Sequence, residues 1–296
     1  MNIRKFAAID VGSNAIRLLV HNVIEEKDKE TKFRKNVLIR VPVRLGEDSF
    51  TKGAISEFNT ERIVKTMKSF SLLMEVIGVE KYKACATSAM REARNGNKVI
   101  ARILKESGIA IELINGKEEA SIIASTDLKK LIQTDQSYLY IDVGGGSTEF
   151  TLFAEGSIKV SRSFKIGTVR LLNNMVNDDI WNDIETWIRK ITKGTSKISI
   201  IGSGGNINKL HKLSGRREGE PLSNIWLNAQ YNFLKSMSYE DRISELGLNP
   251  DRADVIIPAT RIFLSSAKWS GARKIHVPKI GLSDGIIKTL YYANHV

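Results

Sequence analysis

The chain has 296 residues, of which 42% are hydrophobic and 26% are charged. This is enough for two domains with sizeable apolar cores, and no apolar run reaches the roughly 18 residues that a membrane-spanning helix needs. A single cysteine, Cys85, excludes an internal disulfide, and the 4 histidines lack the spacing of zinc ligands. The N-terminal apolar stretch stops at Asp10, too early for a signal peptide, so we expect a cytoplasmic protein with no membrane partner.

The chain is strongly basic: 45 Lys and Arg against 33 Asp and Glu give a formal net charge of +12. A solvated charged surface explains this charge as well as a polyanionic partner does. Among polyanions, nucleic acid is the weaker choice, because the sequence has no zinc finger, basic zipper or aromatic-interleaved signature. Polyphosphate or a highly phosphorylated nucleotide fits better, and no nucleic-acid partner is expected.

The first half predicts a β-rich start followed by alternating helices and strands. A hairpin is expected at 6–23 and a third strand at 33–45, broken at Pro42. A helix at 56–77 is expected to bury one face, formed by apolar residues at helical spacing: Phe58, Ile63, Met67, Phe70, Met74 and Ile77. The elements that follow are a strand at 81–86, a helix at 97–107, a strand at 109–114 and a helix ending near Leu131.

The second half repeats this plan with its own hairpin at 138–153. Further strands are expected at 157–164, 197–202 and 273–277, and helices at 168–176, 179–193, after 203–206, and at 228–237, 251–268 and 283–294. Strands that alternate with helices indicate an α/β fold. We place the boundary at Gln133–Gln136, which gives domains of residues 1–132 and 133–296 packed closely around a cleft.

One short pattern occurs twice and is the strongest functional signal. Residues 9–20 read IDVGSNAIRLLV, and residues 141–152 read IDVGGGSTEFTL. Each copy indicates a hairpin whose glycine-rich turn exposes backbone N–H groups, as in an anion cradle. Two such turns favour one phosphate chain held from both sides, while ordinary hairpin turns are the alternative. The predicted phosphate-binding residues are Gly12, Ser13, Asn14, Gly144, Gly145, Gly146 and Ser147.

An aspartate precedes each glycine-rich turn. Asp142, and with it Asp10, would hold Mg²⁺ directly or through water, because a carboxylate beside phosphate forms a hard oxygen site. The structural alternative is an Asx turn, in which the side chain binds its own backbone. Three successive glycines at 144–146 exceed what a two-residue turn requires.

Two neighbouring glutamates near residue 118 are expected to have different tasks. Asn115 and Glu118 have the spacing of a variant capping box, which gives Glu118 a structural role. Glu119 lies one position further, in the first helical turn, where the helix dipole favours an ionised carboxylate. Such a carboxylate is a plausible water activator, and Glu149 is the second candidate for orienting water or metal. A solvated surface glutamate is the alternative for Glu119.

Several other polar residues allow two interpretations. Arg17 is either a substrate contact or a solvated strand residue. Ser203, Gly204 and Gly205 lie between a strand and a helix, where a helix N-terminus can bind an anion. Arg252 and Asp254 form either a local salt bridge or a substrate contact, and Asp284 can be no more than a helix acid.

Cys85 and Arg91 satisfy the C-x₅-R signature of cysteine-dependent phosphatases. The five residues between them contain no glycine, although that loop must wrap a phosphate with its backbone. Cys85 also falls in a predicted strand, where a buried, inert thiol is the default. A cysteine mechanism is therefore the weaker alternative.

The segments quoted above resemble the exopolyphosphatase / guanosine pentaphosphate phosphohydrolase family within the actin, sugar-kinase and Hsp70 superfamily. Seven matching segments occur in family order: IDVGSNAIRLLV (9–20), ATSAMREARN (86–95), NGKEEA (115–120), IDVGGGSTEF (141–150), IGSGGNI (201–207), RADVIIPA (252–259) and GLSDGII (281–287). Two departures affect substrate choice. Long members carry an extra helical domain, which we expect to be missing from this protein, and the segment at 201–207 has Ser-Gly-Gly-Asn where many relatives have Gly-Thr.

The resemblance implies two ribonuclease-H-like domains flanking a cleft, and hydrolysis of terminal phosphoanhydride bonds, usually with Mg²⁺. Glu119 aligns with the family's catalytic glutamate, and Arg91 with an arginine near phosphate. The implied substrate is inorganic polyphosphate or guanosine pentaphosphate, and a homodimer is a candidate assembly. An ATPase or phosphotransferase of the superfamily and a non-catalytic polyphosphate or alarmone sensor are the alternatives. The basic side chains after the 203–206 turn are candidate distal contacts: Lys209, Lys212, Arg216 and Arg217.

Overall fold

The computed structural model describes residues 1–124, 126, 128–132, 134–195 and 197–293, and the chain divides into two compact units. Unit 1 comprises Met1–Thr126 and Leu282–Val296, and unit 2 comprises Asp127–Gly281. Within the described ranges, no helix is both long and apolar enough to cross a bilayer.

The units differ in two ways from the domains that the sequence predicts. The division follows Thr126 rather than residue 132, and helix α14 (Leu282–Tyr292), which we assigned to the second domain, belongs to unit 1. Leu282, Ile286 and Ile287 of α14 join Phe6 and Leu19 in one hydrophobic core, and burial of this apolar face explains the placement. Gln133, at the predicted boundary, lies outside the described residues.

Unit 1 contains a five-stranded sheet in the order β3-β2-β1-β4-β5. The predicted hairpin is β1 (Asn2–Val11) and β2 (Ile16–Glu25), and β3 (Lys32–Val41) ends just before Pro42. β4 (Lys81–Ala86) and β5 (Ile111–Leu113) run parallel to β1. Proline lacks the N–H that a sheet ladder needs, which accounts for the end of β3.

Unit 2 contains a six-stranded sheet in the order β10-β11-β9-β6-β7-β8. Its strands are β6 (Ser137–Val143), β7 (Thr148–Ala154), β8 (Ser157–Phe164), β9 (Ile198–Ser203), β10 (Leu222–Ser223) and β11 (Lys274–His276). From β8 to β11 this order repeats that of unit 1, with β10 added at the edge. The sequence repeat is therefore a repeat of the fold, and both units are ribonuclease-H-like, as expected.

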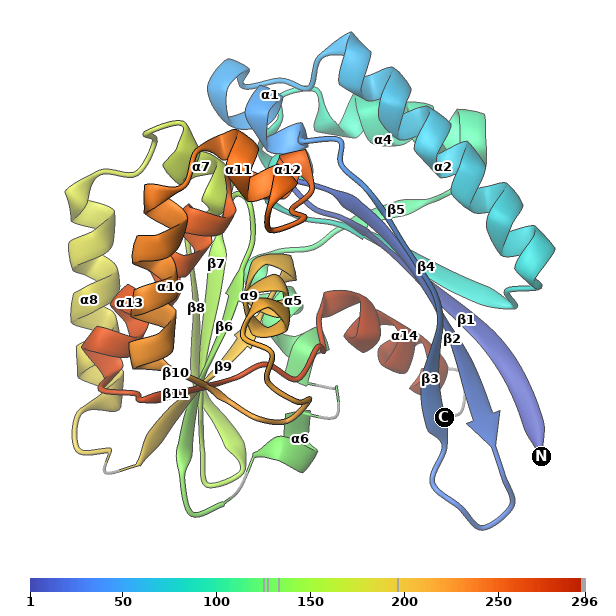
Figure 1. Cartoon of the computed structure of the whole chain (residues 1–296). Helices are drawn as coiled ribbons and strands as arrows, with labels where there is room; N and C mark the ends of the chain where they lie inside the picture. The colour runs from blue at the N-terminus through green and yellow to red at the C-terminus, as the bar shows by residue number, and fades with distance from the viewer. Residues whose placement is uncertain (125, 127, 133, 196, 294–296) are drawn as a thin grey trace. The chain divides into compact units, whose positions relative to one another are not determined.

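The helices of unit 1 lie on both faces of its sheet (Figure 1). They are α1 (Leu45–Lys52), α2 (Glu57–Ile77), α3 (Ser88–Glu92), α4 (Gly96–Ser107), α5 (Gly116–Ala124) and α14. The α2 helix starts at the Ser56 N-cap, ends at Gly78, and buries Ile63, Met67, Phe70 and Met74 as expected. Phe58 was wrongly assigned to the buried face: it is 71% exposed, and the Arg62 guanidinium lies 5.4 Å from its ring centroid.

The longer helices of unit 2 pack beside one another on its sheet. Figure 1 shows α8 (Asp178–Thr192), α10 (Asn224–Ser236) and α13 (Ile256–Ser270) side by side. The others are α6 (Leu128–Leu131), α7 (Thr168–Leu172), α9 (Gly205–Leu213), α11 (Tyr239–Ser244) and α12 (Pro250–Ala253). The single helix expected to end near Leu131 is two helices, α5 and α6. The one- or two-turn helices α1, α3 and α11 were not anticipated.

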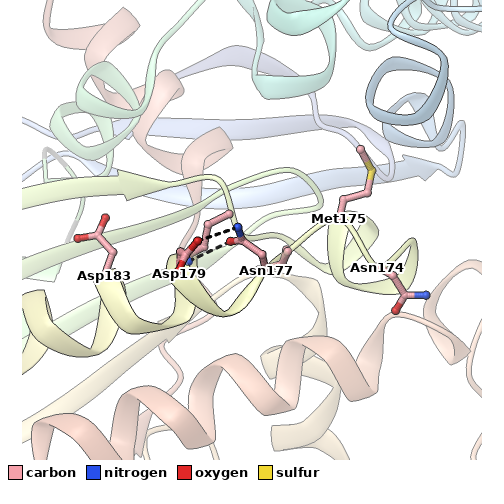
Figure 2. A pocket seen from close by; sticks show the side chains of 7 residues that line it. Asn174, Met175, Asn177, Asp179 and Asp183 are labelled. Carbon is pink, nitrogen blue, oxygen red and sulfur yellow. Dashed lines mark hydrogen bonds between the residues drawn. The ribbon is translucent and has the colours of Figure 1, made fainter.

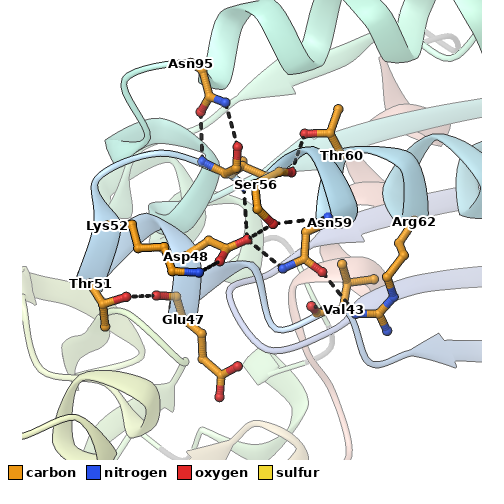
Figure 3. A network of polar contacts seen from close by, with 11 residues as sticks. Val43, Glu47, Asp48, Thr51, Lys52, Ser56, Asn59, Thr60, Arg62 and Asn95 are labelled. Carbon is orange, nitrogen blue, oxygen red and sulfur yellow. Dashed lines mark hydrogen bonds and ion pairs between the residues drawn. The ribbon is translucent and has the colours of Figure 1, made fainter.

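A buried carboxylate ties α1 to α2 (Figure 3). Oδ2 of Asp48 accepts the backbone N–H and the hydroxyl of Ser56 and the amide of Asn59, while Lys52 donates to Oδ1. Burial alone would raise the pKa of Asp48, but these hydrogen bonds outweigh it and lower the pKa from 3.8 to about 2. The ionised form therefore stabilises the fold.

Asp48→Asn should lower the free energy of unfolding at pH 7 by about 2 kcal/mol. Because the folded pKa lies below the unfolded one, this contribution is complete above about pH 4 and is lost as the pH falls through about 2. Urea unfolding of both proteins between pH 7 and 3 measures the difference, and Glu61→Gln, in an exposed pair with Lys65, serves as the control. A difference that stays constant with pH would contradict the assignment.

Candidate active site

The predicted site residues of unit 1 gather at one edge of its sheet. Because β1, β4 and β5 are parallel, their carboxyl ends lie at the same edge. This edge is where open α/β sheets bind ligands. The segments that leave it are the Gly12–Asn14 turn, helix α3 with Arg91, and helix α5 with Glu119.

Asp10 and Arg17 form an ion pair across the first hairpin. The two residues are directly opposed in the β1–β2 register, and Arg17 Nη1 lies 2.8 Å from Asp10 Oδ2. Asp10 is 4% exposed, so its charge needs this partner. The pair gives Arg17 a structural task and makes Asp10 a poorer candidate for metal binding than Asp142.

Two polar groups of the Gly12–Asn14 turn are already engaged within the protein. The Ser13 hydroxyl is 2.9 Å from that of Ser88, so the two satisfy one another. The Gly12 N–H donates to the Ala15 carbonyl at 3.1 Å, and a Cβ on Gly12 would lie 3.2 Å from that oxygen. The turn is close-packed, and the Ser13 hydroxyl and the Gly12 N–H are both used in contacts within the protein.

The predicted capping box at the start of α5 is confirmed. The Asn115 side chain accepts the N–H groups of Lys117 and Glu118 at 2.9 and 3.1 Å, and Glu118 Oε2 accepts the N–H of Asn115 at 2.7 Å. Glu119 follows in the same turn but is only 8% exposed. Glu118 therefore caps the helix, whereas Glu119 is a buried acid rather than a solvated surface one.

Arg91 links two of these segments. Its side chain donates to the carbonyl of Ile114, just before α5, while its N–H donates to Thr87. The residue is half-buried. Arg91 thus lies close to the helix that carries Glu119, and part of its guanidinium is bound to the main chain.

Cys85 is unsuited to be a nucleophile. It is buried in β4, and burial raises the pKa of its thiol to about 12, with Asp10 and Glu119 acting in the same direction. Cys85→Ser should leave turnover nearly unchanged, and the native thiol should react slowly with a disulfide reagent at pH 8. Phosphate release measures the turnover, and titration with the disulfide reagent measures the reactivity of the thiol. Loss of activity in a folded Cys85→Ser protein would support the cysteine mechanism instead.

Unit 2 carries two facing carboxylates where unit 1 has an ion pair. Asp142 on β6 is directly opposite Glu149 on β7, the register position of Asp10 and Arg17. Glu149 is 6% exposed, and its Oε1 accepts the hydroxyls of Ser147 and Ser163 at 2.7 and 2.9 Å. Like charges directly opposed on a sheet destabilise it. This pair therefore favours a cation nearby.

The glycine-rich turn at 144–147 has backbone N–H groups that are not used within the turn. The Gly144 N–H donates to Ser147 O at 3.0 Å, and the Ser147 hydroxyl is taken by Glu149. Within the described part of the chain, no backbone carbonyl accepts the N–H groups of Gly145, Gly146 and Ser147. Three successive N–H groups form the kind of nest that binds anions.

Ser203, Gly204 and Gly205 join β9 to α9 beside Asp142. Ser203 pairs in register with Asp142, and its hydroxyl donates to Ile280 O at 3.2 Å. Gly204 has φ +106°, which strongly favours glycine, and a Cβ there would lie 3.4 Å from Asp142 Oδ1. The α9 N-terminus thus lies next to the Asp142 carboxylate, where the helix dipole favours negative charge.

The basic residues after this turn are not equivalent. The Lys209 ammonium donates to Leu246 O and Gly247 O at 3.1 and 3.2 Å, and burial lowers its pKa together with the charges of Lys212 and Arg252. Lys209 is therefore anchored in the loop after α11 and is a poor candidate for a distal contact. Lys212, Arg216 and Arg217 are exposed.

Three further charged residues, which the sequence left with two interpretations, lie on α14 and at α12. Asp284, in the first turn of α14, lies 3.1 Å from Lys35 Nζ and 3.4 Å from His21 Nε2, both in unit 1. Burial acts to raise the Asp284 pKa, but the hydrogen bond from His21 and the charge of Lys35 lower it. Arg252 lies on α12 and Asp254 at its C-terminal end, in unit 2.

One residue that the sequence analysis missed contacts the turn directly. Arg170 on α7 is 8% exposed, and its Nε donates to Gly146 O at 2.7 Å. The helix itself was expected, at 168–176, and the sequence shows a glycine followed closely by an arginine at 167–170. A contact with a residue 24 positions earlier leaves no local pattern, so the role of Arg170 was not predicted.

A surface depression of about 650 Å³ lies elsewhere in unit 2 (Figure 2). It is lined by the segment that leads into α8: Asn174, Met175, Val176, Asn177, Asp179, Ile180 and Asp183. None of the predicted site residues lines it. Among the described residues, no three His, Cys, Asp or Glu side chains form a metal-binding cluster.

Comparison with known proteins places the chain in a family. The model of the Ppx/GppA phosphatase family matches residues 23–292. The chain is 31% identical over 297 residues to the bifunctional 3-dehydroquinate synthase/phosphatase of Fusobacterium nucleatum, covering 90% of this chain but only 43% of that protein. It is 23% identical to exopolyphosphatase 1 of Mycobacterium tuberculosis, over 96% of this chain and 87% of that one.

Solved structures show the same fold. An exopolyphosphatase from Cytophaga hutchinsonii has a TM-score of 0.87 at 25% identity over 98% of each chain. The Aquifex aeolicus member of the Ppx/GppA family has a TM-score of 0.78 at 23% identity over the full length of both chains. The family match spans most of this chain, and the repeated sheets and the turn geometry agree with it: this protein belongs to the Ppx/GppA phosphatase family.

Proposed function

We propose that this protein is a Mg²⁺-dependent phosphoanhydride hydrolase that releases terminal orthophosphate from inorganic polyphosphate. Family membership and the exopolyphosphatases among its relatives support hydrolysis. The observation that carries the proposal is the 144–147 turn, with its three N–H groups beside the facing Asp142 and Glu149. Conversion of guanosine pentaphosphate to tetraphosphate is a further activity that membership in this family makes plausible.

Phosphoryl transfer to water needs a held phosphate, charge neutralisation and an oriented water. The N–H groups of Gly145, Gly146 and Ser147 would hold the terminal phosphoryl oxygens. Glu119 would take a proton from the attacking water, since a carboxylate at a helix start suits a general base and this one is buried. The proton leaves the water oxygen as that oxygen attacks phosphorus and the bridging P–O bond breaks.

The donor set of unit 2 fits Mg²⁺. This ion commonly takes one or two protein carboxylates and completes its octahedron with water and substrate phosphates, so a three-residue cluster is not required. Asp142 would hold it, with Glu149 opposite as a second ligand or through water. An ion held by these carboxylates would neutralise charge on the phosphate oxygens. Asp10 fits less well, because Arg17 already neutralises it.

The decisive experiment measures orthophosphate release from long-chain polyphosphate, guanosine pentaphosphate and ATP, each with and without Mg²⁺. We expect Mg²⁺-dependent release from polyphosphate. Release from ATP alone would favour the ATPase alternative, and tight polyphosphate binding without any release would favour a sensor. Hydrolysis of guanosine pentaphosphate at comparable kcat/KM would add the second activity.

The positive surface predicts a salt-dependent KM. Remote cationic contacts contribute binding, so their screening should raise KM for long polyphosphate steeply, with much less change in kcat. The Debye length falls from about 10 Å at 0.1 M salt to about 3 Å at 1 M. We also expect activity on short chains, and steady-state kinetics against ionic strength measures both.

A charge-matched pair of triple variants locates the effect. The first variant combines Lys212→Gln, Arg216→Gln and Arg217→Gln. It should raise KM for long chains more than for the shortest substrate. The control replaces three exposed lysines of the β2–β3 hairpin: Lys27, Lys29 and Lys32. Equal effects of the two triple variants would show that only net charge matters. A KM that does not depend on salt would show that the net charge of +12 does not contribute to substrate binding.

A further inference from the structure

The two glycine-rich turns are braced by corresponding helices. In unit 2, the start of α7, which follows β8, donates to the carbonyls of the 144–147 turn. In unit 1, the segment at the start of α1, which follows β3, donates to the carbonyls of Ser13 and Asn14 from Gly46 and Arg44, at 2.8 and 3.0 Å. β3 and β8 occupy matching places in their sheets, so the same arrangement occurs twice.

The brace in unit 2 holds three successive carbonyls. The N–H of Thr168 donates to Gly144 O at 3.0 Å, and that of Val169 to Gly145 O at 2.9 Å. The third, Gly146 O, accepts Nε of Arg170 at 2.7 Å. Arg170 is therefore the only side chain among these three donors, and it is buried.

Holding these carbonyls orients the opposite side of the turn. In a trans peptide the C=O of one residue and the N–H of the next point in opposite directions in one plane. Fixing the oxygens of Gly144, Gly145 and Gly146 therefore directs the N–H groups of Gly145, Gly146 and Ser147 away from α7. These are the N–H groups that no backbone carbonyl accepts within the described part of the chain.

Gly167 shows how closely α7 approaches the turn. A Cβ at this position would lie 2.3 Å from Gly145 O and 2.5 Å from Gly146 N. Its φ of −146° is extended backbone that any residue adopts, so close approach rather than conformation calls for glycine here. The turn and the helix start form one packed unit.

We propose that Arg170 is a positioning residue: with the first N–H groups of α7, it holds the 144–147 turn in the orientation that receives phosphate. The inference rests on the function proposed above, which makes that turn the phosphate site. A turn fixed in advance needs no reorganisation when charge develops on the phosphoryl oxygens, and this is the principal advantage of preorganised N–H donors. A misplacement of 1 Å can cost roughly 100-fold in rate.

The first test removes the side-chain donor. Arg170→Ala should lower kcat/KM on the shortest polyphosphate substrate on the order of 10- to 100-fold, mostly in kcat, and weaken inhibition by orthophosphate. Millimolar guanidinium ion should restore part of the lost activity. The control is Arg189→Ala, on an exposed arginine paired with Glu185 on α8. Unchanged kinetics in folded Arg170→Ala protein would overturn the inference.

The second test removes a backbone donor. It can be carried out even if the Arg170→Ala protein does not fold. Thr168 is the first residue of α7 and Gly167 before it is extended, so Thr168→Pro is compatible with the helix while it deletes the N–H to Gly144 O. Thr168→Val keeps that N–H. We expect Thr168→Pro to be at least about 10-fold slower than Thr168→Val, without guanidinium rescue.

The outcomes separate the inference from the proposed function. A wild-type protein that releases no phosphate contradicts the function. An active wild type with Thr168→Pro and Thr168→Val equal in kcat and in inhibition by orthophosphate contradicts the brace alone. Thermal unfolding of each variant identifies the variants that lose activity only because their folded state is less stable.

Discussion

Glu119→Gln should reduce kcat by on the order of 10²–10⁴, the range for loss of a general base. The substitution keeps the size of the buried side chain but replaces a carboxylate oxygen that can take up a proton with an amide nitrogen that cannot. KM for polyphosphate should change little, because Glu119 acts on water rather than on the phosphate chain. Initial rates of orthophosphate release at saturating substrate measure the effect.

The neighbouring glutamate provides the control. Glu118→Gln retains a side chain that accepts the Asn115 N–H in the capping box, so turnover should stay near the wild-type value. Comparable loss in both variants would point to helix α5 as a whole rather than to one carboxylate. An active Glu119→Gln enzyme beside an inactive, folded Cys85→Ser enzyme would reverse the assignment of the chemistry.

Chelation should abolish turnover, and Asp142→Ala should lose on the order of 10²-fold or more in kcat without rescue by ordinary Mg²⁺ concentrations. The reason is the charge pattern of unit 2, where Asp142 and Glu149 face one another and no arginine takes the register position that Arg17 has in unit 1. A Mg²⁺ titration of phosphate release, and of Mg²⁺ binding by calorimetry, measures both effects.

Asp178→Ala is the matched control, because Asp178 is an exposed acid in the first turn of α8 and lies on no predicted site segment. It should bind Mg²⁺ and turn over like the wild type. Full activity in excess chelator would remove the metal from the mechanism, whereas an Asp142→Ala protein that regains activity at high Mg²⁺ would show a weakened rather than a lost site.

Local sequence signals determined most of the secondary structure correctly. The 81–86 and 157–164 strands have the predicted bounds, and α2 runs between its Ser56 cap and Gly78 as expected. The capping box at Asn115 and both glycine-rich hairpins are also local features. Each depends on residues a few positions apart, which is why the sequence alone reveals them.

The short helices α1, α3 and α11 were missed, because helices of one or two turns owe their stability to tertiary contacts. α1 is held by Asp48 through Ser56 and Asn59, and α3 by contacts such as Ser13 with Ser88. An isolated helix of this length is not stable in water, so neither the periodicity of apolar residues nor helix propensity predicts it. Helix α7 was expected within 168–176, but nothing local in the sequence indicated that Arg170 contacts the 144–147 turn, 24 positions away.

For the site, the sequence by itself determined which residue types lie at the two turns and that Glu118, one position before Glu119, closes the capping box with Asn115. Only the tertiary structure decided that Lys209 is anchored to the loop after α11, that α14 belongs to unit 1, and that Arg170 lies behind the 144–147 turn. Each of these observations depends on contacts between residues that are 24 or more positions apart along the chain. Such contacts follow from how apolar faces are buried and which buried polar groups find partners, and these depend on the whole fold.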